Sequence, residues 1–525
     1  MAADWWKGSV TYQVYPRSFQ DDDGDGIGDL AGITRRLDHI AGLGVDAVWL
    51  SPVFTSPMAD MGYDVSDYRD IDPVFGTLAD FDALVARAHD LGLKVIIDQV
   101  ISHSSDRHPF FVESRSSPDN PRAEWYVWAD PKADGTPPNN WLAIFGGSAW
   151  SWDTRRRQYY FHNFLASQPD FNFHNSAVQD WHLDNMRFWL DRGVDGFRLD
   201  TVNFYFHDAR LRNDAADYRT KLRPDTNPYE MQYHLFSKNQ PENLEFLQKM
   251  RALTDEYDGR MMVGEVGDSN HPIQIMGEYT TGGRLHQAYS FEMLGSHFGP
   301  EHFRQTVRGF FARAPSGWPC WAFSNHDVRR HVSRWLDHGV SRNALAKQAA
   351  ALLLSLQGSV CLYQGEELGQ TETDLDFEEL TDPAGINFWP EEKGRDGCRT
   401  PMVWEAGAPH AGFSTANSTW LPVKPPQAEV AVDTQAGDGS VLSFYRRMLA
   451  LRRQTPALQT GGTEWLATDD PVLAFRRGGE VGCYFNLSPH PVDVSAEGNN
   501  VLISESAELA DARLKLGPNG FALIC

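Results

Sequence analysis

Residues 94–103 read KVIIDQVISH, a continuous apolar run that turns polar at its end. The preceding stretch, 78–91, carries apolar residues at every third or fourth position, which is the period of an amphipathic helix. An apolar run without alternation is typical of a strand buried on both faces, as in a parallel sheet covered by helices. This helix followed by a strand predicts one unit of an α/β fold.

The same pattern recurs along the chain. Further helical faces lie between Val178 and Trp189 and between Leu442 and Leu451. The apolar runs number eight and are Val10–Tyr15, Val45–Leu50, Lys94–Val100, Gly196–Asp200, Met261–Val266, Ala288–Phe291, Pro319–Ser324 and Ser359–Tyr363. Eight such strands alternating with helices predict an α/β protein of the (β/α)8 TIM barrel type.

Two intervals are too long for ordinary barrel loops. The first follows the third strand, is rich in Trp and turn residues, and predicts a small inserted B domain at 104–174. The second, at about 365–437, is rich in Pro, Gly and acidic residues and predicts a long excursion after the eighth strand. Short β-like runs predict a C-terminal antiparallel β domain at 457–525, which leaves the barrel with residues 1–103 and 175–456.

Composition limits the partners. Lys plus Arg number 47 and Asp plus Glu 71, so the net charge is −24, which disfavours nucleic acid and anionic membranes and suits a neutral substrate. The 5 cysteines are scattered, which argues against a disulfide or zinc framework. No signal peptide is recognisable at the start, and no apolar run approaches the roughly 18 residues of a membrane span, so we expect a cytoplasmic protein.

Charged residues gather where the predicted strands end. In a barrel enzyme the reacting groups lie at the carboxyl ends of the strands, so these side chains are expected to converge on one mouth. They are Asp64, Asp98, His103, Arg198, Asp200, Glu265, His326 and Asp327. Three carboxylates at one mouth would be an unusual coincidence for a purely structural pattern.

Several segments carry a family resemblance. Asp98–His103, Gly196–Asp200, Val263–Val266 and Ser324–Asp327 resemble the signature regions of the α-amylase superfamily, glycoside hydrolase family 13. The segments Tyr12–Phe19, Gln168–Asn172 and Gly394–Met402 resemble the α-glucosidase and oligo-1,6-glucosidase branch of that family. The resemblance covers nearly the whole chain and is weakest at the C-terminal end.

The resemblance implies roles for the strand-end residues. Asp200 would be the nucleophile, Glu265 the acid and base, and Asp327 the group that grips sugar hydroxyls. A retaining pair of carboxylates lies about 5 Å apart, with the acid held protonated by an apolar environment. Arg198, two residues before Asp200 on one strand, points to the same face and would keep the nucleophile ionised. His103 and His326 would donate to hydroxyls of the same ring.

The branch resemblance also implies a closed pocket. Asp64 and Arg399 resemble a salt bridge that binds the terminal glucose and blocks longer chains. Tyr63 would stack on that glucose ring. Phe145 and Phe164 are expected as aromatic walls supplied by the inserted domain.

Thr201 directly follows the expected nucleophile and bears on linkage preference. Branch members that prefer α-1,6 bonds resemble one another in having Val at this position, whereas Thr adds a hydroxyl. The residue therefore favours α-1,4 or short mixed substrates, with a maltose-like oligosaccharide as the expected partner.

The segment Asp21–Asp29 predicts a structural cation. Carboxylates at alternate positions with a glycine turn match the first part of a calcium loop, although Gly32 stands where an EF-hand would have Glu. The resemblance implies Ca²⁺, or Mg²⁺, held by Asp21, Asp23, Asp25, Asp29 and the Ile27 carbonyl. We expect no organic cofactor.

The leading interpretation is a retaining, exo-acting α-glucosidase with some capacity for transglucosylation. Three alternatives stay open at this point: an oligo-1,6-glucosidase, a transglucosidase that forms or isomerises sucrose or trehalose, and a non-catalytic partner like a transporter heavy chain. The last is disfavoured because Asp200, Glu265 and Asp327 are all present and no membrane segment is seen. Monomer and homodimer are equally open.

Overall fold

The computed structural model describes residues 4–218 and 226–525. Its centre is a parallel sheet of eight strands, ordered β13-β12-β9-β5-β2-β1-β15-β14. A parallel bridge between Ala288 and Pro319 joins the two ends of that order and closes the barrel. The strands are β1 Val10–Val14, β2 Ala47–Leu50, β5 Lys94–Gln99, β9 Gly196–Leu199, β12 Met261–Val266, β13 Gln287–Ser290, β14 Cys320–Trp321 and β15 Ser359–Tyr363. The predicted TIM barrel is confirmed.

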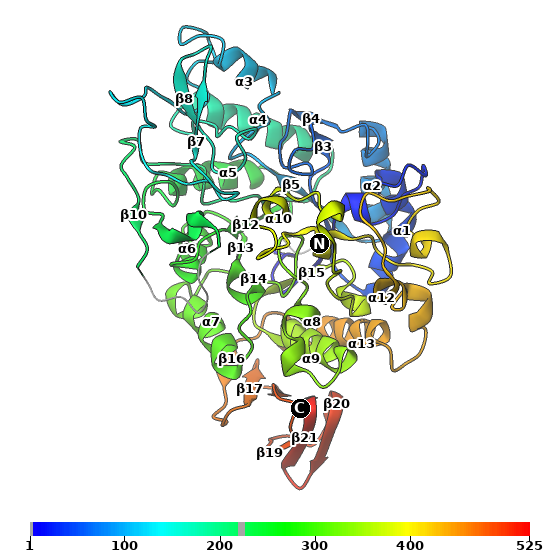
Figure 1. Cartoon of the computed structure of the whole chain (residues 1–525). Helices are drawn as coiled ribbons and strands as arrows, with labels where there is room; N and C mark the ends of the chain where they lie inside the picture. Colours follow the sequence, from blue (N-terminus) through cyan, green and yellow to red (C-terminus); the bar gives the residue numbers. More distant parts are fainter. Residues whose placement is uncertain (1–3, 219–225) are drawn as a thin grey trace.

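Helices surround the barrel (Figure 1). The long ones are α1 Leu30–Leu43, α2 Leu78–Asp90, α4 Ser176–Asp191, α5 Asn243–Thr254, α6 Pro272–Tyr279, α7 Pro300–Arg313, α9 Arg342–Ser355 and α13 Val441–Gln454. In α2, Thr77 and Asp80 form a reciprocal capping box, and Phe81, Leu84, Val85 and Ala88 are buried, as the period of the sequence predicts. Among the described helices, none combines the length and the hydropathy that crossing a membrane requires.

Residues inserted after β5 form a lobe at one end of the molecule (Figure 1). It holds helix α3 Pro109–Ser114 and a three-stranded sheet ordered β6-β8-β7. These strands are β6 Trp128–Ala129, β7 Trp150–Asp153 and β8 Gln158–Phe161. A bridge from His103 to Asp170, with the Phe171 N–H donating to the Ser102 carbonyl at 3.0 Å, ties the lobe to the segment after β5. The lobe is thereby held over the carboxyl ends of the barrel strands.

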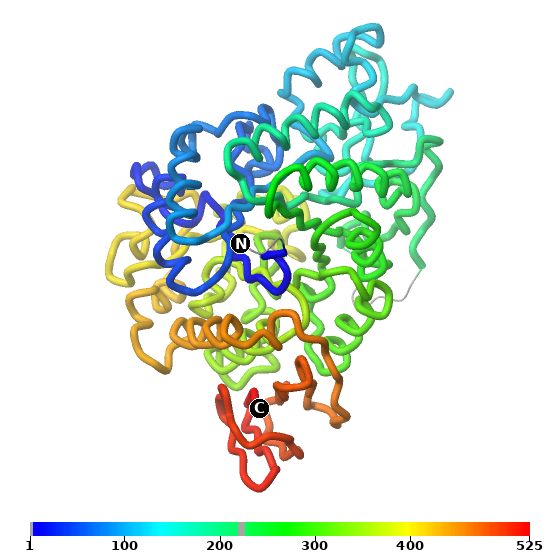
Figure 2. The backbone as a smooth tube through the Cα atoms, turned by 180° about the vertical axis from the view of Figure 1, so that it is seen from behind, coloured from blue at the N-terminus to red at the C-terminus, as the bar shows by residue number. Residues whose placement is uncertain are grey.

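The opposite end of the molecule is an antiparallel sheet, visible in red in Figure 2. It has six strands, with β16-β17-β18-β21-β19 in order and β20 paired to β21. They are β16 Thr463–Trp465, β17 Val472–Arg477, β18 Val481–Asn486, β19 Val492–Ser495, β20 Val501–Ala510 and β21 Arg513–Ile524. Lys347 and Gln348 of α9 hydrogen-bond to this sheet region, which anchors it to the barrel.

The excursion after β15 consists of short helices rather than a regular layer. They are η5 Glu366–Leu368, η6 Phe377–Glu379, α10 Pro383–Phe388, α11 Asp396–Arg399, η7 Pro409–Gly412, α12 Pro425–Ala428 and η8 Val432–Gln435. Asn387 of α10 donates to the Phe145 carbonyl at 3.1 Å, so the excursion touches the inserted lobe. Two short antiparallel strand pairs, β3 Phe54–Thr55 with β4 Asp67–Ile71 and β10 Ala215–Ala216 with β11 Gln232–Tyr233, are the remaining described sheets.

Candidate active site

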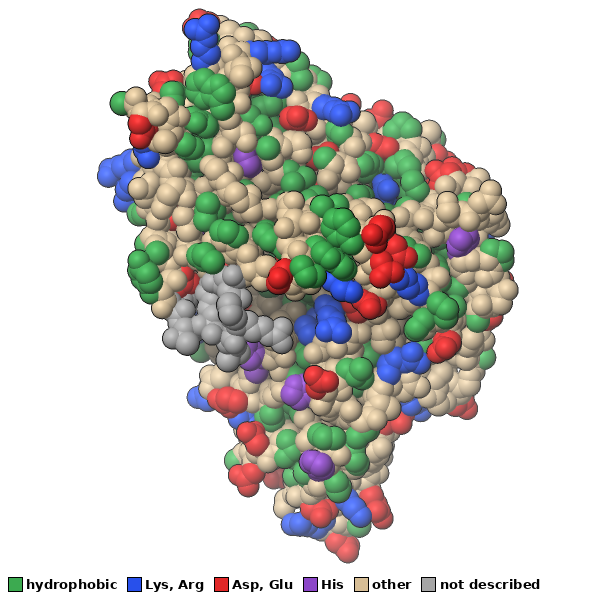
Figure 3. Space-filling model, viewed as in Figure 1, with side chains coloured by type: hydrophobic (Ala, Val, Ile, Leu, Met, Phe, Trp, Pro, Cys, Tyr) green, Lys and Arg blue, Asp and Glu red, His purple; other side chains and the backbone are tan. Residues whose placement is uncertain are grey.

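A pocket of about 830 Å³ opens among the carboxyl ends of the barrel strands, the inserted lobe and the excursion. The surface is hollowed on this face of the molecule (Figure 3). Polar side chains predicted from the sequence line it, namely Tyr63, His103, Asp200, Thr201, Glu265 and Asp327. The residues at the strand ends therefore do converge on one mouth.

Arg198 lies beneath the pocket and contacts three carboxylates. It lies on β9 with no exposed surface, and its Nη1 is 2.6 Å from Asp200 Oδ1. Its Nη2 is 2.6 Å from Glu265 Oε1, and Nη1 also reaches Asp98 Oδ1 at 2.8 Å. A planar guanidinium presents its donors in a fixed fork, so this one side chain holds three carboxylates in defined positions. The predicted pairing of Arg198 with Asp200 is confirmed.

Burial and charge act in opposite directions on the two carboxylates beside Arg198. Burial raises the pKa of Glu265, the Arg198 guanidinium lowers it, and the charges of Asp200 and Asp327 raise it again. Burial likewise raises the pKa of Asp200, against which Arg198 stabilises the ionised form. Because the pKa values of both buried carboxylates are raised, the pair can hold one proton between them near neutral pH, which suits acid–base chemistry at a single carbon.

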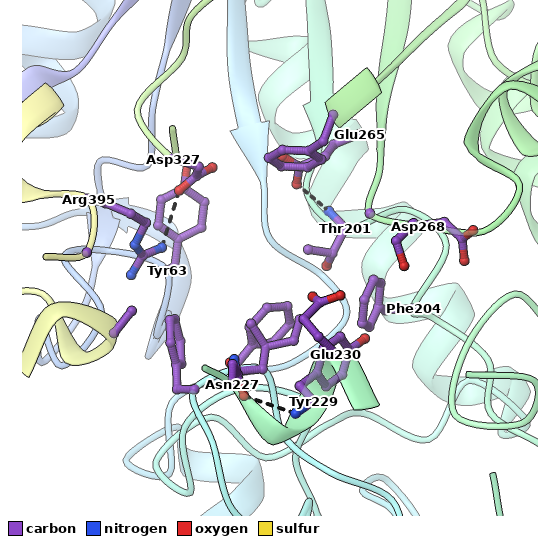
Figure 4. A pocket seen from close by; sticks show the side chains of 18 of the residues that line it. Tyr63, Thr201, Phe204, Asn227, Tyr229, Glu230, Glu265, Asp268, Asp327 and Arg395 are labelled. Atoms are coloured by element: carbon purple, nitrogen blue, oxygen red, sulfur yellow. Dashed lines mark hydrogen bonds and ion pairs between the residues drawn. The ribbon is translucent and has the colours of Figure 1, made fainter. Parts of the chain in front are cut away.

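Glu265 is fixed by two further donors. The Tyr289 hydroxyl donates to its Oε1 at 2.9 Å, and the Thr201 backbone N–H donates to its Oε2 at 3.1 Å (Figure 4). Thr201 has φ 41°, a left-handed conformation that is strained for a β-branched residue. This backbone conformation directs the Thr201 N–H toward Glu265. The Thr201 hydroxyl lies 3.1 Å from Ser102 Oγ and 3.4 Å from Asp200 Oδ2.

Asp327 lies in a cationic corner of the pocket. Its Oδ1 is 3.0 Å from Arg399 Nη2 and 3.2 Å from Arg395 Nη1, and its Oδ2 is 3.3 Å from His326 Nε2. Burial opposes ionisation, but the Arg395 and Arg399 guanidinium groups hold the pKa of Asp327 below its usual range. Asp327 is therefore an ionised carboxylate that can accept hydrogen bonds from hydroxyl groups.

The predicted salt bridge between Asp64 and Arg399 is wrong. Asp64 has no exposed surface and accepts hydrogen bonds from Ser56 Oγ at 2.9 Å and from the Ala59 and Asp60 N–H groups at 2.9 and 3.0 Å. It therefore shapes the turn that precedes Tyr63. Arg399 instead pairs with Asp327, and its Nε donates to the His326 carbonyl at 2.7 Å.

The ion pair that borders the pocket joins Asp60 and Arg395. Arg395 Nη2 lies 2.8 Å from Asp60 Oδ1 and 2.6 Å from Asp382 Oδ1. On its other side, Asp60 Oδ2 accepts from Gln168 Nε2 at 3.1 Å. Figure 4 shows Arg395, Asp327 and Tyr63 on one side of the pocket. Segments from a barrel loop, the inserted lobe and the excursion thus meet at this pair.

The two histidines lie at different depths. His103 borders the pocket, and its Nε2 donates to the Tyr63 carbonyl at 2.9 Å. His326 has no exposed surface and stacks on Tyr63, with ring centroids 5.4 Å apart and an interplanar angle of 7°. Burial lowers the pKa of His103 to about 4 and that of His326 also below its usual range, so both rings are neutral near pH 7.

Aromatic rings form a wall above the floor. Phe145 and Phe164 from the inserted lobe have ring centroids 6.1 Å apart, and Phe164 lies 5.8 Å from Phe204 of the barrel. The Arg395 guanidinium is 5.0 Å from the Phe145 ring. Apolar faces that stand over polar floor groups fit the alternating apolar and hydroxyl surfaces of a sugar.

The acidic loop before α1 brings together part of the predicted metal set. Asp21, Asp23 and Asp29 each offer a carboxylate oxygen, and these atoms lie within 4.8 Å of one another. Asp25 is not in this group, and its Oδ1 accepts from the Ile27 N–H at 2.7 Å. Partial burial and the charges of Asp25 and Asp21 raise the pKa of Asp23. An all-oxygen donor set with mutual repulsion suits a hard divalent cation.

Sequence reasoning missed several pocket residues. Arg395 lies four positions before Arg399, inside the segment Gly394–Met402 already singled out. Asp60 lies four positions before Asp64, outside every segment singled out. In both cases the predicted residue was a close neighbour of the one that lines the pocket. Phe204 and Lys238 also line the pocket, but neither stands at a strand end in the sequence pattern.

Comparisons with known proteins cover nearly the whole chain. The family model for the α-amylase catalytic domain matches residues 13–461. A probable α-glucosidase of Rhizobium meliloti (strain 1021) is 59% identical over 495 residues, which are 92% of this chain and 90% of the relative. An oligo-1,6-glucosidase of Heyndrickxia coagulans is 39% identical over 508 residues, 90% and 89% of the two chains. The crystal structure of the α-glucosyl transfer enzyme XgtA has a TM-score of 0.95 at 52% identity, covering 99% of each chain.

Proposed function

This chain belongs to the α-amylase family and is a glycoside hydrolase, and we propose that it is a retaining, exo-acting α-glucosidase that releases α-glucose from short α-glucosides. The observation that carries the proposal is Arg198, which holds Asp200 and Glu265 at 2.6 Å each, side by side beneath one pocket. The cation between the two carboxylates favours the ionised form of each and burial favours the protonated form of each, so the pair can share the single proton that the reaction needs.

Two displacements on one carbon would follow from this arrangement. Asp200 Oδ attacks the anomeric carbon, the glycosidic C–O bond breaks, and the leaving oxygen takes the proton of Glu265. Glu265, now ionised, removes a proton from water, whose oxygen attacks the same carbon and displaces Asp200. Two inversions give net retention, and Glu265 ends protonated as it began.

Selection of a terminal glucose would follow from the pair of Asp60 and Arg395. The pair borders the pocket beside Asp327 and offers a carboxylate and a guanidinium to the hydroxyls of the ring. A chain that continued past that ring would meet this buried ion pair, so only a non-reducing end would fit. We expect Asp327 and His103 to bind further hydroxyls and Tyr63 to stack on the ring.

The preferred glycosidic linkage and the capacity for transglucosylation are the finer parts of the proposal. The Thr201 hydroxyl lies beside Asp200, where it can meet the next sugar, which supports α-1,4 over α-1,6 bonds. Relatives carry α-glucosidase, oligo-1,6-glucosidase and α-glucosyl transfer activities in their names. Transfer to a second sugar differs from hydrolysis only in which hydroxyl reaches the glycosyl-enzyme, so we include transglucosylation as a side reaction.

Proton NMR of the protein with maltose, and separately with isomaltose, tests this proposal. We expect an early excess of α-glucose over its equilibrium share, because the glucose from the non-reducing end keeps the α configuration while the reducing-end glucose leaves as the anomeric mixture already present. We also expect maltose to be consumed several-fold faster than isomaltose. An early excess of β-glucose over its equilibrium share would overturn retention. New disaccharides in excess of glucose would favour the alternative of an isomerising transglucosidase.

We also propose a structural Ca²⁺ or Mg²⁺ in the acidic loop, with Asp21, Asp23 and Asp29 as carboxylate ligands and no organic cofactor. The support is the convergence of these three oxygens within 4.8 Å. The ion would neutralise the loop before α1 and take no part in glucose transfer. Cytoplasmic location and the choice between monomer and homodimer stay predictions.

A further inference from the structure

Lys238 is a buried lysine in the wall of the pocket. It lies between η2 (Pro228–Met231) and α5, and only 3% of its surface is exposed. Its Nζ donates to the Tyr229 hydroxyl at 3.0 Å and to the Gly267 carbonyl at 2.8 Å, and lies 4.0 Å from Asp268 Oδ2. The amine therefore connects the loop after β9 to the end of β12.

Burying an ammonium group is unfavourable unless it meets acceptors and opposite charge. Burial lowers the pKa of Lys238, while the carboxylate of Asp268 acts in the opposite direction. The Nζ also stands 4.8 Å from the centre of the Phe204 ring, within cation–π range. These contacts keep the amine at one point in the wall.

The backbone beside Lys238 is held just as firmly. Asn239 has φ 60°, and its Nδ2 donates to Asp268 Oδ2 at 2.7 Å. Asn203 Nδ2 donates to Asn239 Oδ1 at 2.7 Å, and Asn203 Oδ1 accepts from the Gly267 N–H at 2.9 Å. A left-handed asparagine fixed by its side chain is a rigid support for the residue before it.

This wall lies on the side of the acid. Gly267 is two residues beyond Glu265 on the same chain segment, and Phe204 is four beyond Asp200. In Figure 4, Glu265, Thr201, Phe204, Asp268 and Tyr229 stand together, across the pocket from Asp327 and Arg395. The side of the acid is where a leaving group departs and where an acceptor must arrive.

We propose that Lys238 is a positioning residue for the leaving-group side of the pocket, which holds Tyr229 and the Gly267 segment in the shape that binds a neutral, hydroxyl-bearing sugar there. The inference rests on the proposed α-glucosidase function. It assigns Lys238 no part in holding the glucose that reacts with Asp200. The residue would therefore affect substrates according to their leaving group.

Two donors with the same glucosyl ring separate these roles. Maltose departs as glucose and fills the leaving-group side, whereas α-glucosyl fluoride departs as fluoride and leaves that side empty. For Lys238→Met we expect kcat/KM for maltose to fall at least about tenfold, and for α-glucosyl fluoride to change less than about twofold. Tyr229→Phe, which removes only the hydroxyl, should likewise lower kcat/KM for maltose more than kcat/KM for α-glucosyl fluoride.

Lys347→Met is the matched control. Lys347 is also a buried lysine, 8% exposed and 3.2 Å from Glu505, but it lies on α9 outside the pocket lining. We expect the ratio of kcat/KM for maltose to kcat/KM for α-glucosyl fluoride in Lys347→Met to equal that of the unaltered protein. Equal losses for both donors in Lys238→Met, or no loss for either, would overturn the inference. If the unaltered protein cleaves neither donor, the proposed function itself fails, which is a separate result.

Discussion

Asp60 and Asp64 are two buried acids four residues apart whose partners differ in kind. The carboxylate of Asp64 is satisfied by Ser56 and by two backbone N–H groups, so it serves the local turn. The carboxylate of Asp60 meets Arg395 across the pocket border and Gln168 from the inserted lobe. Asp64 is a structural acid, whereas Asp60 lines the pocket where we propose that substrate binds.

Paired substitutions test this difference. For Asp60→Asn we expect kcat/KM for maltose to fall about 100-fold, because Arg395 loses an opposite charge and a sugar hydroxyl loses its acceptor. For Asp64→Asn we expect a lower melting temperature with kcat/KM changed less than about threefold, because only the turn loses an acceptor. Steady-state kinetics with thermal melts of both variants check this. The reverse assignment of the two effects would contradict the structure.

Sequence reasoning located this region but chose the wrong pair for a physical reason. Two acids four residues apart in a turn, and two arginines four residues apart in the excursion, cannot be told apart without their partners. Burial and hydrogen bonding decide between them, and both depend on three segments far apart in the chain. Arg198 and Asp200 were easier because alternation along one strand already places them on one face, and Glu265 was easier because it stands near the carboxyl end of another apolar strand.

At the scale of elements, the barrel strands were predictable and the hairpins were not. Continuous apolar runs such as Lys94–Gln99 and Ser359–Tyr363 mark strands buried on both faces. β3 and β10 have only two residues each, too few for any period to show. The short helices of the excursion were likewise hidden in a stretch rich in Pro and Gly.

The acidic loop before α1 links a predicted cation to a helix start. Asp29 Oδ1 accepts from the Gly32 N–H at 2.6 Å and caps α1, while the same residue belongs to the cluster with Asp21 and Asp23. Removing a bound cation would leave these carboxylates repelling one another at the beginning of a helix.

Chelation therefore should lower the melting temperature by several degrees, and Ca²⁺ or Mg²⁺ should restore it. Asp23→Asn, which leaves the cap intact, should abolish the response to the chelator. Elemental analysis of the purified protein gives the independent check. An identical melting temperature with and without chelator, together with no bound metal, would contradict the proposed cation.

Across the whole molecule, one strand serves stability at one end and chemistry at the other. β9 ends at Leu199, directly before Asp200, and begins after Asp195, at the opposite end of the barrel. Asp195 is 1% exposed and lies 2.6 Å from His89, 2.9 Å from Lys94 and 2.8 Å from Arg260. Burial alone would raise the pKa of Asp195, but hydrogen bonds from His89, Lys94 and the Val95 N–H lower it below its usual value.

The sign of the pH effect follows from that lowered pKa. The ionised Asp195 stabilises the folded state above the pKa of an unfolded Asp, about 4, and this contribution is lost as pH falls through the lower folded value. Asp195→Asn should lower the free energy of unfolding by about 1–3 kcal/mol at pH 7, since the partly exposed Lys94 and Arg260 lose a charged acceptor.

Thermal melts from pH 7 down to pH 3 should show the difference in melting temperature between Asp195→Asn and the unaltered protein becoming smaller below about pH 4. Asp38→Asn, which removes an exposed partner of Arg87, is the control and should change the melt little at any pH. A gap that widened as pH fell would contradict the assignment.

The proposed reaction requires that Asp200 form a covalent bond to glucose. Mass spectrometry after incubation with a slowly hydrolysed fluorinated α-glucosyl fluoride, followed by digestion to identify the labelled peptide, tests for this bond. We expect one glucosyl label per chain, located on Asp200, and none in Asp200→Asn. A label on another carboxylate would contradict it, as would an unlabelled protein that turns the reagent over to a β-anomer.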